Sequence, residues 1–199
     1  MPTGVKIEKQ SDGTTLFVDY DNKYQIVLPS DWAAVSFTEE EFDQAAGQII
    51  ASDPNFQQMA EGLKNVDSDA YRLAAFNINR SYMNGTFPSL LTINAFSDSM
   101  AGTMPMAFVT AMIEDTVLKD ATSTTWEVVD NANKVEIGIV KGTRKITFPN
   151  GLSTAVQELV ISFQANKKLI VVEIATPGKF GDQILSPVEE SIDFIKTDI

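Results

Sequence analysis

The sequence predicts an α+β domain in which helices cover a mainly antiparallel β-sheet. Residues 135–177 read as a meander of three strands, with turn signals at Asn150-Gly151 and Asn166-Lys167. One face of the second hairpin is wholly apolar and the other is mixed, so helices are expected on both faces. With 199 residues, 44% of them hydrophobic, the chain is long enough to bury a core in one domain, residues 1–199.

Two alternating runs near the N-terminus, residues 14–20 and 23–28, predict a hairpin around Asp21-Asn22. This turn would place Phe17 opposite Ile26 and Thr15 opposite Leu28, so that the faces of the two strands agree. Pro29 has no N–H to donate and ends the pairing.

Helices are predicted next at residues 38–49, from a capping box that begins at Thr38, and after Asp53-Pro54. Strands follow at 71–78 and 89–96. Pro105 opens a helix that runs to about Lys119. One side of that helix is expected to carry Val109, Met112, Ile113, Thr116 and Val117.

A strand is expected at 126–129 and a turn at 130–133. In the second hairpin of the meander, the Asn166-Lys167 turn pairs Phe163 with Ile170, Ile161 with Val172, and Leu159 with Ile174. The last helix is predicted to start at Ser186-Pro187, because Pro suits the first helical position. Its core residues would be Val188, Ile192 and Ile195.

Composition excludes several kinds of chemistry. The chain has no cysteine and no histidine, so it lacks thiolates, the usual general base near neutral pH and the commonest transition-metal ligand. No dinucleotide-binding, P-loop or nucleophile-elbow motif is present. The net charge of −12 disfavours nucleic acid and favours a cationic partner or simple solubility. We therefore expect no catalytic residue, no metal site and no cofactor.

Glu158 and Glu173 are expected on one face of the second hairpin, in neighbouring pairs. Two close carboxylates can separate their pKa values and perform acid–base chemistry. Lys141, Arg144 and Lys145 lie on the preceding strand and could neutralise them. Ion pairing is therefore the preferred interpretation, and a glycosidase-like enzyme that uses two carboxylates is the minor alternative.

Two loops rich in methionine and aromatic residues, 79–88 and 97–104, are the best binding candidates. Flexible thioethers and aromatic rings suit adaptable contact surfaces. The alternative is that these side chains tuck into the end of the core. The candidate binding residues are Tyr82, Met83, Phe87, Met100 and Met104.

The order of elements resembles the PsbP-like superfamily, which includes photosystem II PsbP, Mog-type Ran-binding proteins and bacterial lipoprotein domains. The resemblance spans nearly the whole chain. It is carried by the hairpin that ends in Leu28-Pro-Ser-Asp-Trp32, by Lys141-Gly142-Thr143 in the meander, by Ala175-Thr176-Pro177, and by a final helix over residues 191–196. It implies an α/β/α sandwich around a central antiparallel sheet. No metal ligand is carried over, because the metal sites of photosynthetic members involve histidine.

The resemblance also implies a non-enzymatic, extracytoplasmic accessory domain that docks to a protein partner. The alternative is a small-molecule or lipid carrier with a cavity between the sheet and the helix of residues 105–119. No apolar run is long enough to span a membrane, and residues 1–6 lack the apolar core of a signal peptide. We expect either a mature exported domain, anchored through a segment removed from its N-terminus, or a cytoplasmic protein.

Overall fold

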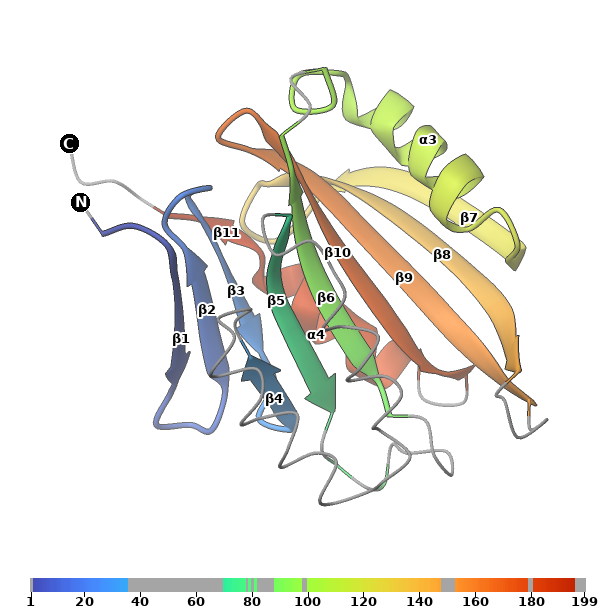
Figure 1. The fold of residues 1–199 in the computed structure, drawn as a ribbon, viewed down its shortest axis with the longest axis horizontal. Coiled ribbons are helices and arrows are strands. Elements are labelled where there is room, and N and C mark those ends of the chain that lie inside the picture. Colours follow the sequence, from blue (N-terminus) through green and yellow to red (C-terminus); the bar gives the residue numbers. More distant parts are fainter. Residues whose placement is uncertain are drawn as a thin grey trace.

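The computed structural model describes residues 2–35, 70–77, 79, 81, 88–97, 100–147, 153–178 and 181–195. These residues form two antiparallel sheets and two helices, α3 (Met106–Val117) and α4 (Gly181–Ser191) (Figure 1). The chain is thus of the α+β class, as predicted. The helices predicted at 38–49 and after Pro54 lie outside the described residues.

The larger sheet is built around the predicted meander. Its strand order is β4-β5-β6-β10-β9-β8-β7, and every neighbouring pair is antiparallel. The predicted strand at 126–129 is the centre of the longer β7. The bounds are β4 (Trp32–Val35), β5 (Tyr71–Asn77), β6 (Leu90–Phe96), β7 (Thr122–Asp130), β8 (Glu136–Thr147), β9 (Ser153–Ala165) and β10 (Lys168–Pro177).

The register predicted for the hairpin of β9 and β10 is confirmed. Phe163 pairs with Ile170, Ile161 with Val172 and Leu159 with Ile174. The turn residues Asn166 and Lys167 have φ angles of 48° and 64°, as a two-residue hairpin with the right twist requires. The turn predicted at Asn150-Gly151 lies outside the described residues.

The N-terminal hairpin belongs to a second sheet, which the sequence did not predict. This sheet has the order β1-β2-β3-β11, with β1 (Val5–Lys9), β2 (Thr15–Asp19), β3 (Tyr24–Leu28) and β11 (Asp193–Phe194). The hairpin register is as predicted, with Thr15 opposite Leu28 and Phe17 opposite Ile26.

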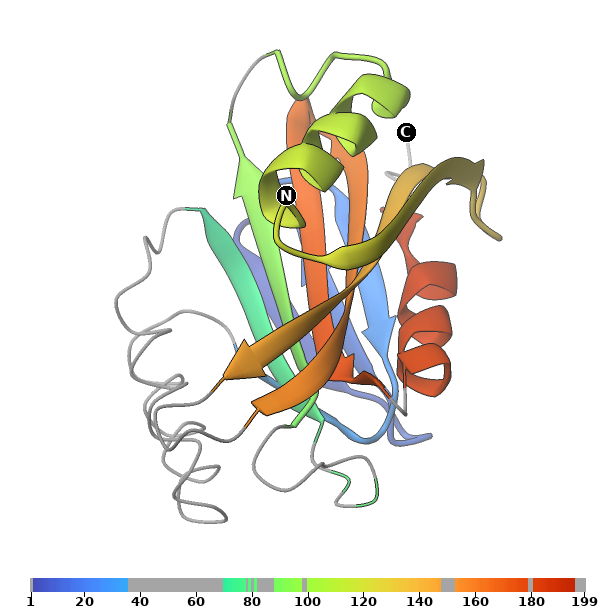
Figure 2. The ribbon, with the colours of Figure 1, turned by 90° about the vertical axis from the view of Figure 1, so that its right-hand side faces the viewer.

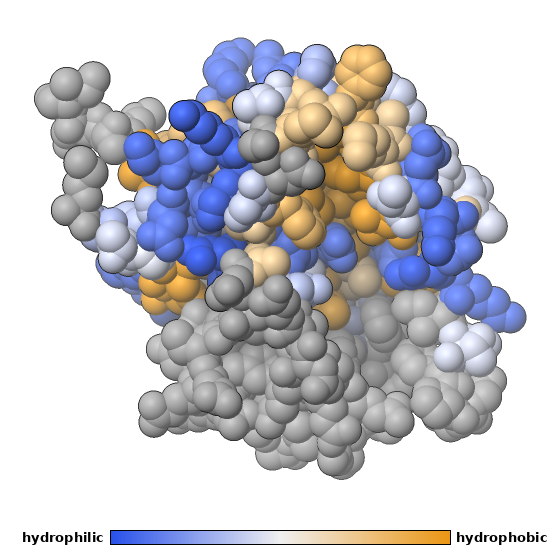
Figure 3. Space-filling view, turned by 45° about the horizontal axis from the view of Figure 1, so that its top comes forward, coloured by the Kyte–Doolittle hydropathy of each residue, from blue (hydrophilic) through white to orange (hydrophobic). Residues whose placement is uncertain are grey.

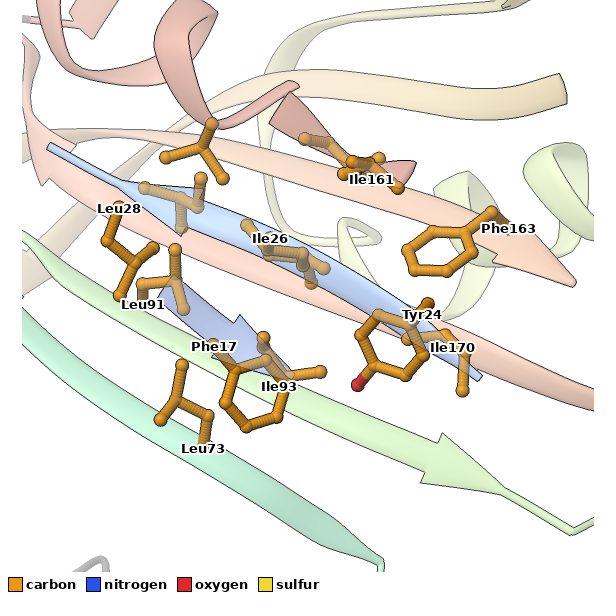
Figure 4. Close-up of a cluster of buried hydrophobic side chains, with 14 of the residues drawn as sticks. Phe17, Tyr24, Ile26, Leu28, Leu73, Leu91, Ile93, Ile161, Phe163 and Ile170 are labelled. Atoms are coloured by element: carbon orange, nitrogen blue, oxygen red, sulfur yellow. The ribbon is translucent and has the colours of Figure 1, made fainter. Parts of the chain in front are cut away.

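The main core fills the space between the two sheets. Figure 4 shows side chains of β2 and β3 facing those of the larger sheet. The Tyr24 ring packs edge-on against Phe163, with ring centroids 5.1 Å apart. Val188 of α4 and Ile192, which follows the helix, are fully buried in the same core. The smaller sheet and α4 therefore share one face of the larger sheet.

Helix α3 covers the opposite face, over β7, β8 and β9 (Figure 2). Met106, Val109 and Ile113 form a second core there with side chains such as Val140 and Val160. The helix approaches closely at Gly138, because a Cβ at that position would overlap the Thr110 hydroxyl. Of the five residues predicted on one side of this helix, Val109 and Ile113 are buried, while Met112, Thr116 and Val117 are exposed.

The prediction for the last helix is wrong at both ends. Helix α4 starts at Gly181, so Pro187 lies inside it, and it ends at Ser191. The carbonyl of Ile192 accepts hydrogen bonds from the side-chain amides of Asn131 and Asn133, at 2.8 and 3.0 Å. The chain then pairs with the open edge of β3 as β11. The predicted core residue Ile195 and the final helix over 191–196 are therefore not part of α4.

Candidate functional site

A groove lies between α3 and the larger sheet, beside β6 and β10. Its volume is about 200 Å³, and its lining is almost entirely apolar. We call it the α3 groove. Its walls include Phe96 from β6, Met104 from the loop before α3, Met112 and Val117 from α3, and Val171 and Glu173 from β10.

The loop of residues 100–104, which forms one wall of the groove, is held against the sheet. The Gln164 side-chain amide of β9 donates to the carbonyls of Ala101 and Met104, at 3.0 and 2.6 Å. Gly102 packs so closely on the β9–β10 turn that a Cβ would overlap the Lys167 carbonyl oxygen. The groove wall is thus fixed by the same hairpin that supplies its floor.

Exposed apolar side chains surround the groove. Phe96 and Val117 are 42% and 37% exposed, and Met112 is 54% exposed. Met100 and Phe108, which flank the groove residues in sequence, are more exposed still. Figure 3 shows apolar residues gathered on the upper surface, where α3 lies, with hydrophilic residues on either side. A contiguous exposed apolar area of this kind marks an interaction surface.

Among the described residues that line the groove, Glu173 carries the only ionisable side chain. Burial raises the pKa of its carboxyl above the ordinary value, and the negative charge of Glu158 raises it further, while Arg144 opposes both. Arg144 itself forms an ion pair with Glu158, as the preferred interpretation of this carboxylate pair required. Glu158 thus has a cation beside it, whereas the Glu173 carboxylate faces the groove.

The structure describes two of the five predicted binding residues. Met104 is half-buried and lines the α3 groove, and Met100 is exposed, next in sequence to the lining residue Ala101. Tyr82, Met83 and Phe87 lie outside the described residues, so their role stays a prediction.

Sequence reasoning did not name Phe96, Met112, Val117 or Glu173 as binding residues. A signal for Met112 was present, because Phe108 and Met112 are four residues apart and form a second apolar stripe on α3. A helix that is apolar on two sides either packs its second side against another element or exposes that side to solvent. Only the placement of α3 shows that this stripe borders a groove.

No helix among the residues that the structure describes is long and apolar enough to cross a membrane. Within the same ranges, no group of three or more carboxylates is arranged to hold a metal ion.

A scan against models of protein families found no match, and a search of curated proteins found none either. Solved structures do match. LpqN of Mycobacterium tuberculosis, described as involved in cell envelope biogenesis, is 9% identical with a TM-score of 0.47. The match covers 95% of this chain and 89% of LpqN.

Two further structures match over nearly the whole chain. Cyanobacterial PsbP from Synechocystis sp. PCC 6803 is 10% identical, with a TM-score of 0.48 and coverage of 98% of this chain and 94% of its own. The Ran-binding protein Mog1p of Saccharomyces cerevisiae is 12% identical, with a TM-score of 0.47 and coverage of 98% and 97%. A cyanobacterial PsbP and a Mog-type Ran-binding protein, both groups named in the resemblance, are thus among the matches. The likeness concerns the fold alone.

Proposed function

We propose that this chain is a single, non-catalytic binding domain that docks an apolar segment of a partner protein in the α3 groove. The observation that carries the proposal is the apolar groove bordered by exposed methionine and phenylalanine side chains. Burying these side chains against a partner removes their apolar surface from water, which is the main favourable term in protein association. Methionine adapts its shape to different partners at little cost.

A protein segment suits this groove better than an enclosed ligand does. Pockets that enclose a drug-sized ligand have volumes of about 300–1,000 Å³. The α3 groove holds about 200 Å³ and is partly open, since Met112, Val117 and Phe96 reach the surface. Such a site accommodates a few side chains of a partner whose remaining surface lies over α3.

The carrier hypothesis places its cavity at this same position, between the sheet and α3. Native mass spectrometry of the purified protein separates the two functions. A small molecule that co-purifies, and that is lost when Val117 is replaced by Glu, would favour the carrier. Protein without a bound small molecule is the result expected for a docking domain.

Site-specific photo-crosslinking tests the docking function. We would place p-benzoylphenylalanine at position 112, beside the groove, and at position 194 as a matched control. Phe194 is exposed on β11, which belongs to the other sheet. The expected result, in extract of the source cells, is a discrete protein adduct from position 112 that Val117→Glu abolishes.

Two results would contradict the proposal. One is the same adduct from positions 112 and 194, which would indicate non-specific contact. The other is the absence of any adduct from position 112. An extracytoplasmic setting, which the PsbP-like resemblance implies, belongs to the same proposal, and the cell fraction in which the adduct forms would test it.

A further inference from the structure

Several hydrogen-bond acceptors lie in or near the α3 groove. Glu173 contributes a carboxylate to the groove wall. Among the residues that the structure describes, the buried oxygens Oδ1 of Asn94 and Oε2 of Glu158 have no hydrogen-bond partner, and neither has the buried donor Nε of Arg144. Asn94 is 3% exposed, and leaving such a buried acceptor unpaired is unfavourable.

The sheet register places these acceptors on the α3 side of adjacent strands. Asn94 of β6 lies opposite Val171, which lines the groove two residues before Glu173. Glu158 of β9 lies opposite Ala175, two residues after Glu173. Side chains two residues apart on a strand share a face, so Asn94, Glu173 and Glu158 all point to the side that α3 covers.

Arg144, the cation already present, does not pair with all of these acceptors. Arg144 forms its ion pair with Glu158, and no ion pair or hydrogen bond to the Glu173 carboxylate occurs among the residues that the structure describes. A second positively charged donor in the groove would therefore meet the carboxylate of Glu173, one strand away from the unpaired oxygen of Asn94.

Building on the proposed function, we propose that the partner segment carries a basic side chain whose charged end pairs with Glu173 while its apolar stem lies in the α3 groove. Lysine and arginine are suited to this arrangement, because their stems cover apolar surface and their ends carry only donors. Arginine fits best, since its five N–H groups can serve a carboxylate and a neighbouring oxygen together. The net charge of −12 attracts such a partner.

The test uses the full chain labelled with ¹³C in its methionine methyl groups. Met104 and Met112 line the groove and report occupancy by NMR. The probes are octylguanidinium, which has an apolar chain and a cationic end, and octylurea, its neutral analogue. We expect octylguanidinium to bind at least about tenfold more tightly than octylurea, as a charge-assisted hydrogen bond predicts.

Glu173→Gln removes the charge with little change in shape, so it should abolish the preference for octylguanidinium. Glu190→Gln is the matched control, since Glu190 is exposed on α4 at the opposite face and its loss changes the net charge equally. This variant should keep the preference. Circular dichroism confirms that both variants are folded.

The outcomes separate the two proposals. Equal binding of both probes to the wild-type groove, or a preference that survives in Glu173→Gln, would overturn the basic-residue proposal and leave apolar docking intact. No shift at Met104 and Met112 with either probe would overturn both.

A second arm tests the assignment to a protein segment. The peptide acetyl-Leu-Phe-Arg-Leu-Phe-amide is compared with the same peptide in which citrulline, a neutral isostere, replaces arginine. Tighter binding of the arginine peptide is expected. If octylguanidinium binds and neither peptide does, the groove takes small amphiphilic cations and the protein-segment assignment is wrong.

Discussion

At the scale of single residues, one ion pair ties the two sheets together. Asp19, at the end of β2, is fully buried and accepts hydrogen bonds from Arg72 of β5, at 2.8 and 3.0 Å. The backbone amide and the side-chain amide of Asn22 donate to the same carboxylate. A second carboxylate, from Asp21, contacts Arg72 at the surface.

Replacing Arg72 by Met should destabilise the protein by roughly 3–5 kcal/mol, because Asp19 would keep a buried charge without its cation. Asp21→Asn is the control, since that carboxylate is exposed and its pairing with Arg72 contributes about 1 kcal/mol or less. Urea unfolding monitored by circular dichroism measures both. Equal losses of stability in the two variants would mean that the buried Asp19 carboxylate is tolerated without Arg72.

Glu173 makes stability depend on pH. Its pKa is raised above 4.5 by burial and by Glu158, against the opposing charge of Arg144. Burial, and after it the charge of Glu173, raise the pKa of Tyr71 on β5. The folded chain thus holds the Glu173 proton more tightly than the unfolded chain does. Stability from this group is greatest below pH 4.5 and is lost as the pH rises through the pKa of folded Glu173.

Glu173→Gln should therefore be more stable than the wild type at neutral pH. The difference should shrink as the pH falls toward 4.5, where the wild-type carboxyl also becomes neutral. Urea unfolding at a series of pH values measures the difference in stability between the two proteins. A gap that stays constant across the series would show that Glu173 titrates normally in the folded protein.

At the scale of elements, α3 has two apolar stripes with different roles. Met106, Val109 and Ile113 pack on the sheet, while Phe108 and Met112 face outward. The first stripe docks the helix on the sheet, and the α3 groove is lined by Val109 and Ile113 of this stripe and by Met112 of the second. The docking of the helix and the groove both depend on the close approach of α3 to β8 at Gly138. The distance between α3 and the sheet sets the width of the groove.

Gly138→Ala should force α3 outward, since the new methyl group would overlap the Thr110 hydroxyl. Overpacking of this kind costs about 1–3 kcal/mol. Gly178→Ala is the matched control, because a Cβ there would make ordinary contact with Gln157 at 3.8 Å. Thermal unfolding compares the two, and the methyl resonances of Met104 and Met112 should shift in Gly138→Ala alone. Equal stability of both variants would contradict the close packing of α3.

At the scale of the whole molecule, the acidic charge and the apolar groove act over different distances. The net charge of −12 attracts cations over roughly one Debye length, about 10 Å at 0.1 M salt. The groove acts only in contact. Affinity for a basic, apolar partner therefore combines an electrostatic contribution, which salt screens, with an apolar contribution from the groove, which salt does not screen.

Octylguanidinium should bind the wild type several-fold more weakly when salt is raised from 50 to 500 mM, because salt screens its attraction to the acidic protein. Octylurea has no charge and should lose little affinity over the same range. The methyl NMR titration measures both probes. An equal response of the two to salt would show that charge has no part in binding at the α3 groove.

The sequence by itself determined the strands of the meander and two hairpin registers. Phe163 faces Ile170 and Phe17 faces Ile26 because alternation with period two and a short turn leave one register that buries the apolar face. The ion pairing of Glu158 with a cation on β8 followed from the same local geometry. Such features depend on residues close in sequence or on adjacent strands.

Only the tertiary structure decided the rest. Residues 193–194 form β11 instead of continuing α4, because the distant edge of β3 pairs with them and Asn131 caps the preceding carbonyl. The α3 groove likewise joins β6, α3 and β10, and no local pattern states which apolar stripe of α3 meets the sheet. These outcomes depend on packing between elements far apart in the chain, where burial overrides local preference.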